Sequence, residues 1–179
     1  MTVHDFQASL NAVKAAEPLC DATWRAFFGN RLRHVERNHG DNPHQRLGTD
    51  VVAVLSGGVV VRLEEKVRPL KDYGDVLLEL YSNKERGTPG WARKDLFCDY
   101  LAFVYVPTKR AVVFPWQSLR RALAINGNDW HRKAKAGEYG FRLIDAQNRG
   151  YTTQSLCVPY SFVQQAGAGG VDLSIAEAA

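Results

Sequence analysis

The sequence predicts a mixed α/β domain in which a central β-hairpin belongs to a mixed sheet with helices on both faces. Strand-like apolar runs alternate with helix-like segments, and glycines at 57 and 58 separate two β-branched runs. A chain of 179 residues, 45% apolar and 23% charged, has room for one domain with a buried core. We expect that domain over residues 1–163 and a disordered, Ala- and Gly-rich tail over residues 164–179.

The N-terminal segment predicts two helices. Apolar side chains recur at roughly helical spacing from residue 3 to residue 28, and Pro18 divides them before Gly29. The polar, turn-rich stretch that follows predicts a short strand over residues 32–37 and then a loop.

The register of the hairpin follows from its turn. If residues 56–58 form a three-residue loop whose last glycine is left-handed, Leu55 pairs with Val59 and Asp50 pairs with Glu64. Directly opposed residues point to the same side of a sheet. The two carboxyl groups are therefore expected on one face.

Alternation of side chains along the second strand adds Lys66 to that face and leaves the other face apolar. A two-residue turn at Gly57-Gly58 would instead oppose Asp50 with Glu65 and send Lys66 to the opposite face. We prefer the first register, because it leaves only Glu65 discordant on the apolar side. Glu64 and Glu65 both remain candidates for the second acid.

The next segments predict a strand, a loop and a helix. Residues 75–81 read as a buried strand and residues 82–90 as a loop with glycine and proline. Residues 91–105 predict a helix that Pro107 stops. Its buried stripe would contain Leu96, Tyr100, Phe103 and Val104.

The remaining elements follow from similar signals. Residues 111–114 predict a strand covered on both faces, and residues 116–125 predict a helix that ends at Asn126-Gly127. Two more strands are expected on either side of a turn at residues 148–150.

The charges of the hairpin predict a metal site. Two carboxylates a few ångström apart repel each other unless a cation lies between them, and oxygen ligands with open water positions suit Mg²⁺ or Mn²⁺. Asp50 and Glu64 would hold the metal, and Lys66 would orient or deprotonate the attacking water. The chemistry expected of this set is hydrolysis of a phosphodiester bond.

The hairpin resembles the PD-(D/E)xK nuclease superfamily, in which an acid on one strand and an acid-x-Lys on the next bind metal. Asp50 matches the first acid, Glu64 the second and Lys66 the lysine. Downstream, the family's following strand, helix and next strand are matched by "DVLLELYSN", "GTPGWARKDLFCDYLAFVYVP" and "RAVVFPW". The second of these also resembles uncharacterised phage and prophage proteins associated with the superfamily.

The resemblance covers Asp50 to Trp116 and departs from the family pattern at Thr49, which stands where a proline often precedes the first acid. It implies a restriction-endonuclease-like fold and a Mg²⁺- or Mn²⁺-dependent nuclease, acting on DNA, with a homodimer as one arrangement for cutting both strands. The alternative is a nuclease-like protein of phage or prophage origin that binds or assembles with nucleic acid without catalysis.

Two further residues are candidates for supporting roles. Glu79 lies in an apolar strand, where an acid is costly unless it is paired or bound to metal, so it is a candidate third metal ligand. Gln45 lies five residues before Asp50 and is a candidate contact to a scissile phosphate or a water molecule.

A basic and aromatic run, with two arginines before it, is the candidate surface for a nucleic-acid backbone. Trp130 would offer a stacking surface there. The set consists of Arg120, Arg121, Trp130, Arg132, Lys133 and Lys135. A solvated helix end and loop is the competing interpretation.

Charge and cysteine content limit the class of protein. The net charge of +4 and pI near 9.0 mildly favour a polyanionic partner. Three widely spaced cysteines predict reduced core thiols, not a zinc site or a disulfide framework. The first residues lack a signal-peptide pattern, and no apolar stretch is long enough to span a bilayer, so we expect a cytoplasmic protein without a membrane partner.

Overall fold

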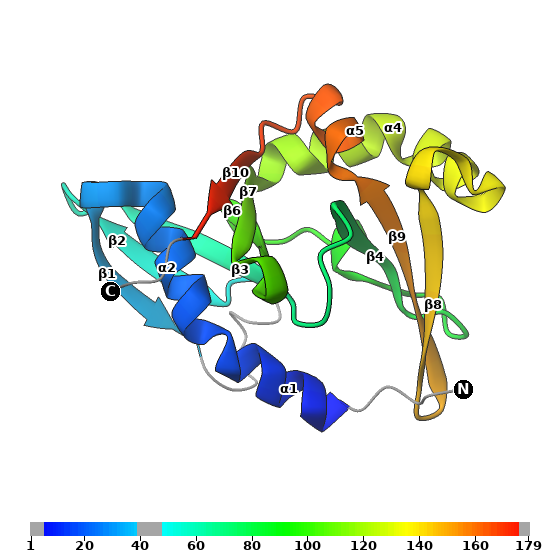
Figure 1. Ribbon diagram of the computed structural model, residues 1–179, viewed down its shortest axis with the longest axis horizontal. Coiled ribbons are helices and arrows are strands. Elements are labelled where there is room, and N and C mark those ends of the chain that lie inside the picture. Colours follow the sequence, from blue (N-terminus) through cyan, green and yellow to red (C-terminus); the bar gives the residue numbers. More distant parts are fainter. Residues whose placement is uncertain (1–5, 39–47, 176–179) are drawn as a thin grey trace. The chain divides into compact units, whose positions relative to one another are not determined.

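The computed structural model describes residues 6–38 and 48–175, which form two compact units, each with its own sheet (Figure 1). The mixed α/β class is confirmed. The six-stranded unit comprises residues 10–38, 48–72, 96–117 and 169–175, and the four-stranded unit comprises residues 6–9, 73–95 and 118–168.

The N-terminal segment forms the two expected helices, α1 (Phe6–Ala15) and α2 (Glu17–Phe28). Pro18 lies in the first turn of α2, where its missing N–H group is not needed. Gly29 ends α2 with a φ of 58°, and a 3₁₀ turn (Gly29–Arg31) leads into the first strand.

The six-stranded sheet has the order β1-β2-β3-β6-β7-β10. β3 and β6 are parallel and all other neighbours are antiparallel, so the sheet is mixed. A 3₁₀ turn (Val106–Thr108) joins β6 to β7. The strands are β1 (Leu32–Arg37), β2 (Val51–Leu55), β3 (Val60–Arg68), β6 (Tyr100–Tyr105), β7 (Arg110–Pro115) and β10 (Val171–Ser174).

Helix α2 covers one face of this sheet (Figure 1). Trp24 and Phe28 are buried there, and their rings stack with centroids 6.1 Å apart. They lie in one apolar cluster with alternate residues of the strands, namely Val51, Ala53, Leu55, Val61, Leu63, Ala102, Val104, Ala111 and Val113. Burial of this cluster fixes which side of each strand faces α2.

The prediction of a helix over residues 91–105 is wrong. This segment forms a 3₁₀ turn (Trp91–Arg93), an extended stretch and the strand β6. Residues 101–105 are all buried because β6 lies in the middle of the sheet between β3 and β7. An apolar run buried on both faces has no polar side, so its spacing imitates the stripe of a helix.

The four-stranded sheet is antiparallel, in the order β5-β4-β9-β8. The expected strands on either side of residues 148–150 are confirmed as β8 and β9. The elements of this region are β4 (Asp75–Asn83), β5 (Thr88–Pro89), α4 (Trp116–Ala136), a 3₁₀ turn (Glu138–Gly140), β8 (Arg142–Asn148), β9 (Tyr151–Pro159) and α5 (Tyr160–Gln165).

Helix α4 does not end at Asn126-Gly127 but continues to Ala136. Within the helix, Asn126 Nδ2 donates to the Ala122 carbonyl at 3.0 Å. Trp130 and Ala134 on the continuation are buried. Packing of this second half of the helix therefore outweighs the low helix propensity of asparagine and glycine.

The tail expected to be disordered from residue 164 is ordered as far as residue 175. Gln164 and Gln165 complete α5, and β10 pairs with β7 at the edge of the six-stranded sheet. Arg110 forms a bidentate ion pair with Asp172, with both N···O distances at 2.8 Å. This pair and strand pairing hold a segment whose composition suggested disorder.

Replacing Ile175 by alanine should lower the free energy of unfolding by about 2 kcal/mol or more, because the side chain is 6% exposed in the apolar cluster under α2. Val171→Ala, on the same segment and 43% exposed, is the matched control and should change it by less than about 0.5 kcal/mol. Urea unfolding followed by circular dichroism measures both. Equal, negligible effects would contradict the ordered position of this segment.

Candidate functional site

The preferred register of the hairpin is confirmed. Val51 pairs with Leu63 and Val54 with Val60, which places Asp50 opposite Glu64. The turn is closed by hydrogen bonds from the Leu55 amide to the Val59 carbonyl (2.8 Å) and from the Gly58 amide to the Leu55 carbonyl (3.1 Å). Gly58 has a φ of 76°, the left-handed conformation that such a turn requires.

Glu65 lies on the α2 side of β3 and has a structural role. Its carboxylate accepts hydrogen bonds from Trp24 Nε1 at 2.6 Å and from Arg37 Nη1 at 2.7 Å. Arg37 also pairs with Asp21 on α2. The carboxylate is thus satisfied by partners that fasten α2 and β1 to β3, and the open choice between the two glutamates resolves geometrically in favour of Glu64 as the neighbour of Asp50.

Asp50 is held in place from both sides. The Glu65 amide donates to Asp50 Oδ2 at 3.1 Å, and the Asn38 amide donates to the Asp50 carbonyl at 2.9 Å. The preceding residue, Thr49, donates its hydroxyl to the Phe97 carbonyl at 3.0 Å. These bonds fix the start of β2, so the Asp50 carboxylate has a defined position on the sheet.

Gly48 makes the close approach before Asp50 possible. Its φ is 78°, and a Cβ atom there would lie 2.7 Å from Leu96 Cδ2. Only glycine meets both conditions without strain. The sequence did not reveal this requirement, because Leu96 is distant along the chain.

Glu64 is the most perturbed acid of the site. The residue is 4% exposed, and burial, opposed by the positive charge of Lys66 and helped by the negative charge of Asp50, raises its pKa to about 7. Lys66 Nζ forms an ion pair with Glu64 Oε1. Among the described residues, Glu64 Oε2 has no hydrogen-bond donor although it is buried.

Lys66 shares the face of Glu64, as the alternation of β3 predicts. Its side chain is 27% exposed, so the ammonium group is half-buried beside the carboxylates. Asp50, Glu64 and Lys66 are therefore brought together by a single hairpin. An unsatisfied carboxylate oxygen beside a second carboxylate is a position that a cation or a proton would satisfy.

Cys98 lies near this group, although the sequence gave no sign of it. The backbones of Arg62 and Asp99 bond to each other, with the Asp99 amide 2.7 Å from the Arg62 carbonyl, which ties the segment before β6 to β3. Burial, together with the negative charge of Glu64 and against the positive charge of Lys66, raises the pKa of the Cys98 thiol to about 12. Cys98 is thus a protonated thiol beside the carboxylates, and all three cysteines are free and buried, as expected.

The two supporting candidates, Glu79 and Gln45, do not belong to the hairpin. Glu79 lies in β4, in the four-stranded unit, where its carboxylate accepts a hydrogen bond from the Trp91 amide at 3.3 Å. Gln45 lies outside the described residues. Across residues 6–38 and 48–175, no cluster of three or more His, Cys, Asp or Glu side chains is arranged to hold a metal ion.

Several of the candidate nucleic-acid contacts are already engaged within the protein. Arg132 and Lys133 both pair with Asp129, at 2.8 and 2.6 Å, and Arg120 pairs with Asp95. Arg121 and Lys135 are exposed. The stacking role expected of Trp130 is wrong, because its ring is only 3% exposed on α4 and offers no free face to a base.

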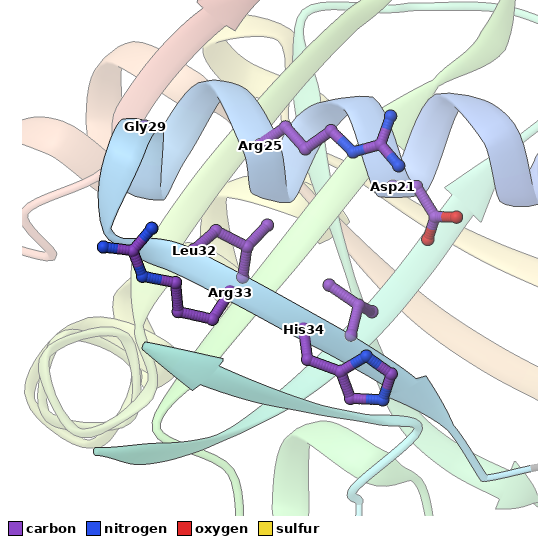
Figure 2. A pocket seen from close by; sticks show the side chains of 7 residues that line it. Asp21, Arg25, Gly29, Leu32, Arg33 and His34 are labelled. Carbon is purple, nitrogen blue, oxygen red and sulfur yellow. The ribbon is translucent and has the colours of Figure 1, made fainter. Parts of the chain in front are cut away.

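A polar hollow of about 380 Å³ lies in the six-stranded unit, lined by residues of α2 and β1 (Figure 2). Figure 2 shows Arg25 and Asp21 on the helix and Arg33 and His34 on the strand. Because Asp21 pairs with Arg37, which in turn pairs with Glu65, the hollow is on the α2 side of the sheet and not on the side of Glu64.

Comparison of the chain with models of protein families, with curated proteins and with solved structures returned no match. In the part of the chain that the structure describes, no helix is both long enough and apolar enough to cross a membrane.

Replacing each of the adjacent residues Glu64 and Glu65 by glutamine should change the stability of the protein in opposite directions. Because the pKa of Glu64 rises from 4.5 to about 7 on folding, the folded state keeps a proton that the unfolded state loses. Wild-type stability should therefore fall as pH rises between these values, by up to about 3 kcal/mol. Glu64→Gln should remove this dependence and be the more stable protein above about pH 7.

Glu65→Gln is the matched control one residue away. It leaves Arg37 without its buried partner and should cost about 3 kcal/mol at neutral pH. Urea unfolding at a series of pH values compares both variants with the wild type. If Glu64→Gln were destabilising at every pH, Glu64 would be an ordinary structural ion-pair residue.

Proposed function

We propose that the protein is a metal-dependent nuclease that hydrolyses phosphodiester bonds of DNA, with Asp50, Glu64 and Lys66 as its active site. The observation that carries the proposal is the buried Glu64 Oε2, which has no donor among the described residues and lies beside a second carboxylate. Ordinary structural carboxylates are paired, as Glu65 is. A site that leaves one buried carboxylate oxygen without a donor is typical of function.

The donor set fits Mg²⁺ or Mn²⁺. These ions take oxygen ligands, and Mg²⁺ keeps several waters while binding one or two protein carboxylates. Asp50 and Glu64 supply two such groups without a third protein ligand, so Glu79 is not required for binding. When bound, the ion would polarise a phosphoryl oxygen and stabilise the charge of the leaving group.

The chain's own residues supply orientation and proton transfer. Asp50 and Glu64 are fixed by the strand register and by backbone hydrogen bonds, so their oxygens point to one place on the sheet. Lys66 lies beside them with part of its side chain in solvent, where its Nζ can orient a water molecule for attack on phosphorus. No covalent intermediate with the protein is needed.

The proposal includes a restriction-endonuclease-like fold. In its support, the acids lie on a hairpin in a mixed sheet, a helix covers the opposite face, and the next strand of the sheet, β6, runs parallel to β3. One part of the resemblance does not hold. The segment expected as the helix after β4 is β6 and its approach, so the connection from β4 to β6 contains only a two-residue strand and a short 3₁₀ turn.

The second candidate is a nucleic-acid-binding or assembly protein that keeps this hairpin without catalysis. The ion pair between Lys66 and Glu64 favours it, because a lysine engaged by a buried carboxylate is less available to a water molecule. The two candidates differ in one observable. Only the nuclease requires the carboxylates and Lys66 for a metal-dependent change in the nucleic acid.

Cleavage of plasmid and single-stranded DNA in Mg²⁺ or Mn²⁺ should be lost in Asp50→Asn and in Lys66→Met, by about a hundredfold or more. Asparagine retains an oxygen that can accept from the Glu65 amide, and methionine retains most of the lysine volume, so both variants should fold. Gel analysis of the products, together with circular dichroism of each variant, measures the effect.

Lys84→Met is the matched control, because Lys84 also pairs with a carboxylate, Asp145, but lies in the four-stranded unit and is exposed. It should cut like the wild type. Wild-type protein that retains DNA without cutting it would replace the nuclease by the binding protein. If the Asp50→Asn variant still cleaved DNA, the active site would lie at other residues.

Metal affinity should depend on the protonation of Glu64. Its pKa of about 7 means that binding of Mg²⁺ or Mn²⁺ displaces a proton at lower pH. The dissociation constant should therefore rise by about tenfold per pH unit below about pH 7 and level off above it. Isothermal titration calorimetry in buffers of different ionisation enthalpy measures both the constant and the released proton. A constant independent of pH would exclude Glu64 as a ligand.

A further inference from the structure

The four-stranded unit contains a cavity of about 300 Å³ that the candidate active site does not use. Its apolar part is formed by Leu80, Leu123 and Leu156, which come from β4, α4 and β9. Its polar part consists of Tyr81, Arg93, Asn128 and His131. Apolar walls with a few polar groups at one side are typical of pockets for small organic ligands.

The polar side of the cavity carries positive charge. Arg93 lies over the ring of Tyr81, with its guanidinium carbon 4.7 Å from the ring centroid. His131 and Lys135 are four residues apart on α4 and so share a face of the helix. Burial lowers the pKa of His131, and the positive charges of Lys135 and Arg93 lower it further.

No carboxylate balances these groups in the described part of the chain. The residues that line the cavity include no aspartate or glutamate, and neither Arg93 nor Lys135 forms an ion pair with a described residue. The neighbouring cations Arg132 and Lys133 differ, because both pair with Asp129. The cations at the cavity are therefore suited to bind an anion, whereas Arg132 and Lys133 on the same helix already have an acidic partner.

The shape of the cavity adds a second requirement for the ligand. Gly127 lies on the α4 side, where a Cβ atom would come within 3.3 Å of Leu123 Cδ1. The absence of a side chain keeps space open against the leucines. A ligand that matches both parts has a compact anionic group joined to a largely apolar body.

We propose that this cavity binds a nucleotide, with the phosphate at Arg93 and His131, near Lys135 on the same face of α4, and the base against Leu80, Leu123 and Leu156. Asn128 is placed to give or accept a hydrogen bond at the base edge or the sugar. The same chemistry is presented by a free nucleotide and by one unit of a nucleic-acid strand. The proposal does not depend on hydrolysis at Asp50.

Fluorescence anisotropy with a labelled single-stranded oligonucleotide of about ten nucleotides, in buffer with EDTA, tests the proposal without any metal. Arg93→Gln and Lys135→Gln should each weaken binding by about fivefold to tenfold, because each removes a charge-assisted contact to phosphate. Arg132→Gln is the matched control on the same helix. Since Arg132 is held by Asp129, affinity should change by less than about twofold.

The apolar part is tested by filling the cavity. Gly127→Leu favours the helix and occupies the space against Leu123, so binding should be lost while α4 stays folded. Ala124→Leu adds the same side chain at an exposed position of α4 and should bind like the wild type. Circular dichroism of both variants checks the helix.

Competition by thymidine monophosphate distinguishes the two sources of the ligand. Displacement at concentrations where inorganic phosphate has no effect, with the same dependence on Arg93 and Gly127, supports the cavity as a site for a free nucleotide. Oligonucleotide binding that depends on these residues without displacement supports a site for a strand. Equal affinity of the wild type and all pocket variants, or binding of neither ligand, overturns the proposal and leaves the active-site proposal untouched.

Discussion

The candidate site depends on the hydrogen bonds from Trp24 and Arg37 to the Glu65 carboxylate. Side chains alternate along β3, so anchoring Glu65 under α2 forces Glu64 and Lys66 to the opposite face. A slip of one residue would place those two charges under α2 and expose the leucine and valines that now form the core. The interaction that stabilises α2 on the sheet is thus also the one that orients the active-site candidates.

Much of the hairpin could be predicted because its geometry is local. The turn and the alternation of apolar residues lie within about twenty residues, and together they fix which residues oppose each other. The partners of Glu65 could not be predicted in the same way. Trp24 and Arg37 are 41 and 28 residues away along the chain, so only the folded structure shows why a glutamate on the apolar side is tolerated.

The errors elsewhere share a physical cause, which is that tertiary contacts outweighed local signals. The run from Leu101 to Tyr105 has the apolar spacing of a helix but is buried on both faces between β3 and β7. Buried Trp130 continues α4 past a glycine stop signal, and Asp129 on the same helix neutralises two of the cations expected to meet nucleic acid. The sequence therefore suggested more unpaired positive charge on this helix than the structure has.

The electrostatics of Glu64 connect the two candidate functions of the hairpin. Under the proposal, three cations would compete for this carboxylate: a proton, which its raised pKa favours near neutrality; the Lys66 ammonium group, which engages Oε1; and a divalent ion, which Oε2 and Asp50 would bind. If the ion pair with Lys66 is the strongest of these interactions, Glu64 and Lys66 have only a structural role. If a divalent ion bound both carboxylates, it would weaken the ion pair between Glu64 and Lys66 and leave the ammonium group able to orient water. Under the proposal, catalysis and simple binding would therefore differ in the relative strength of these interactions at the Glu64 carboxylate, and not in the fold.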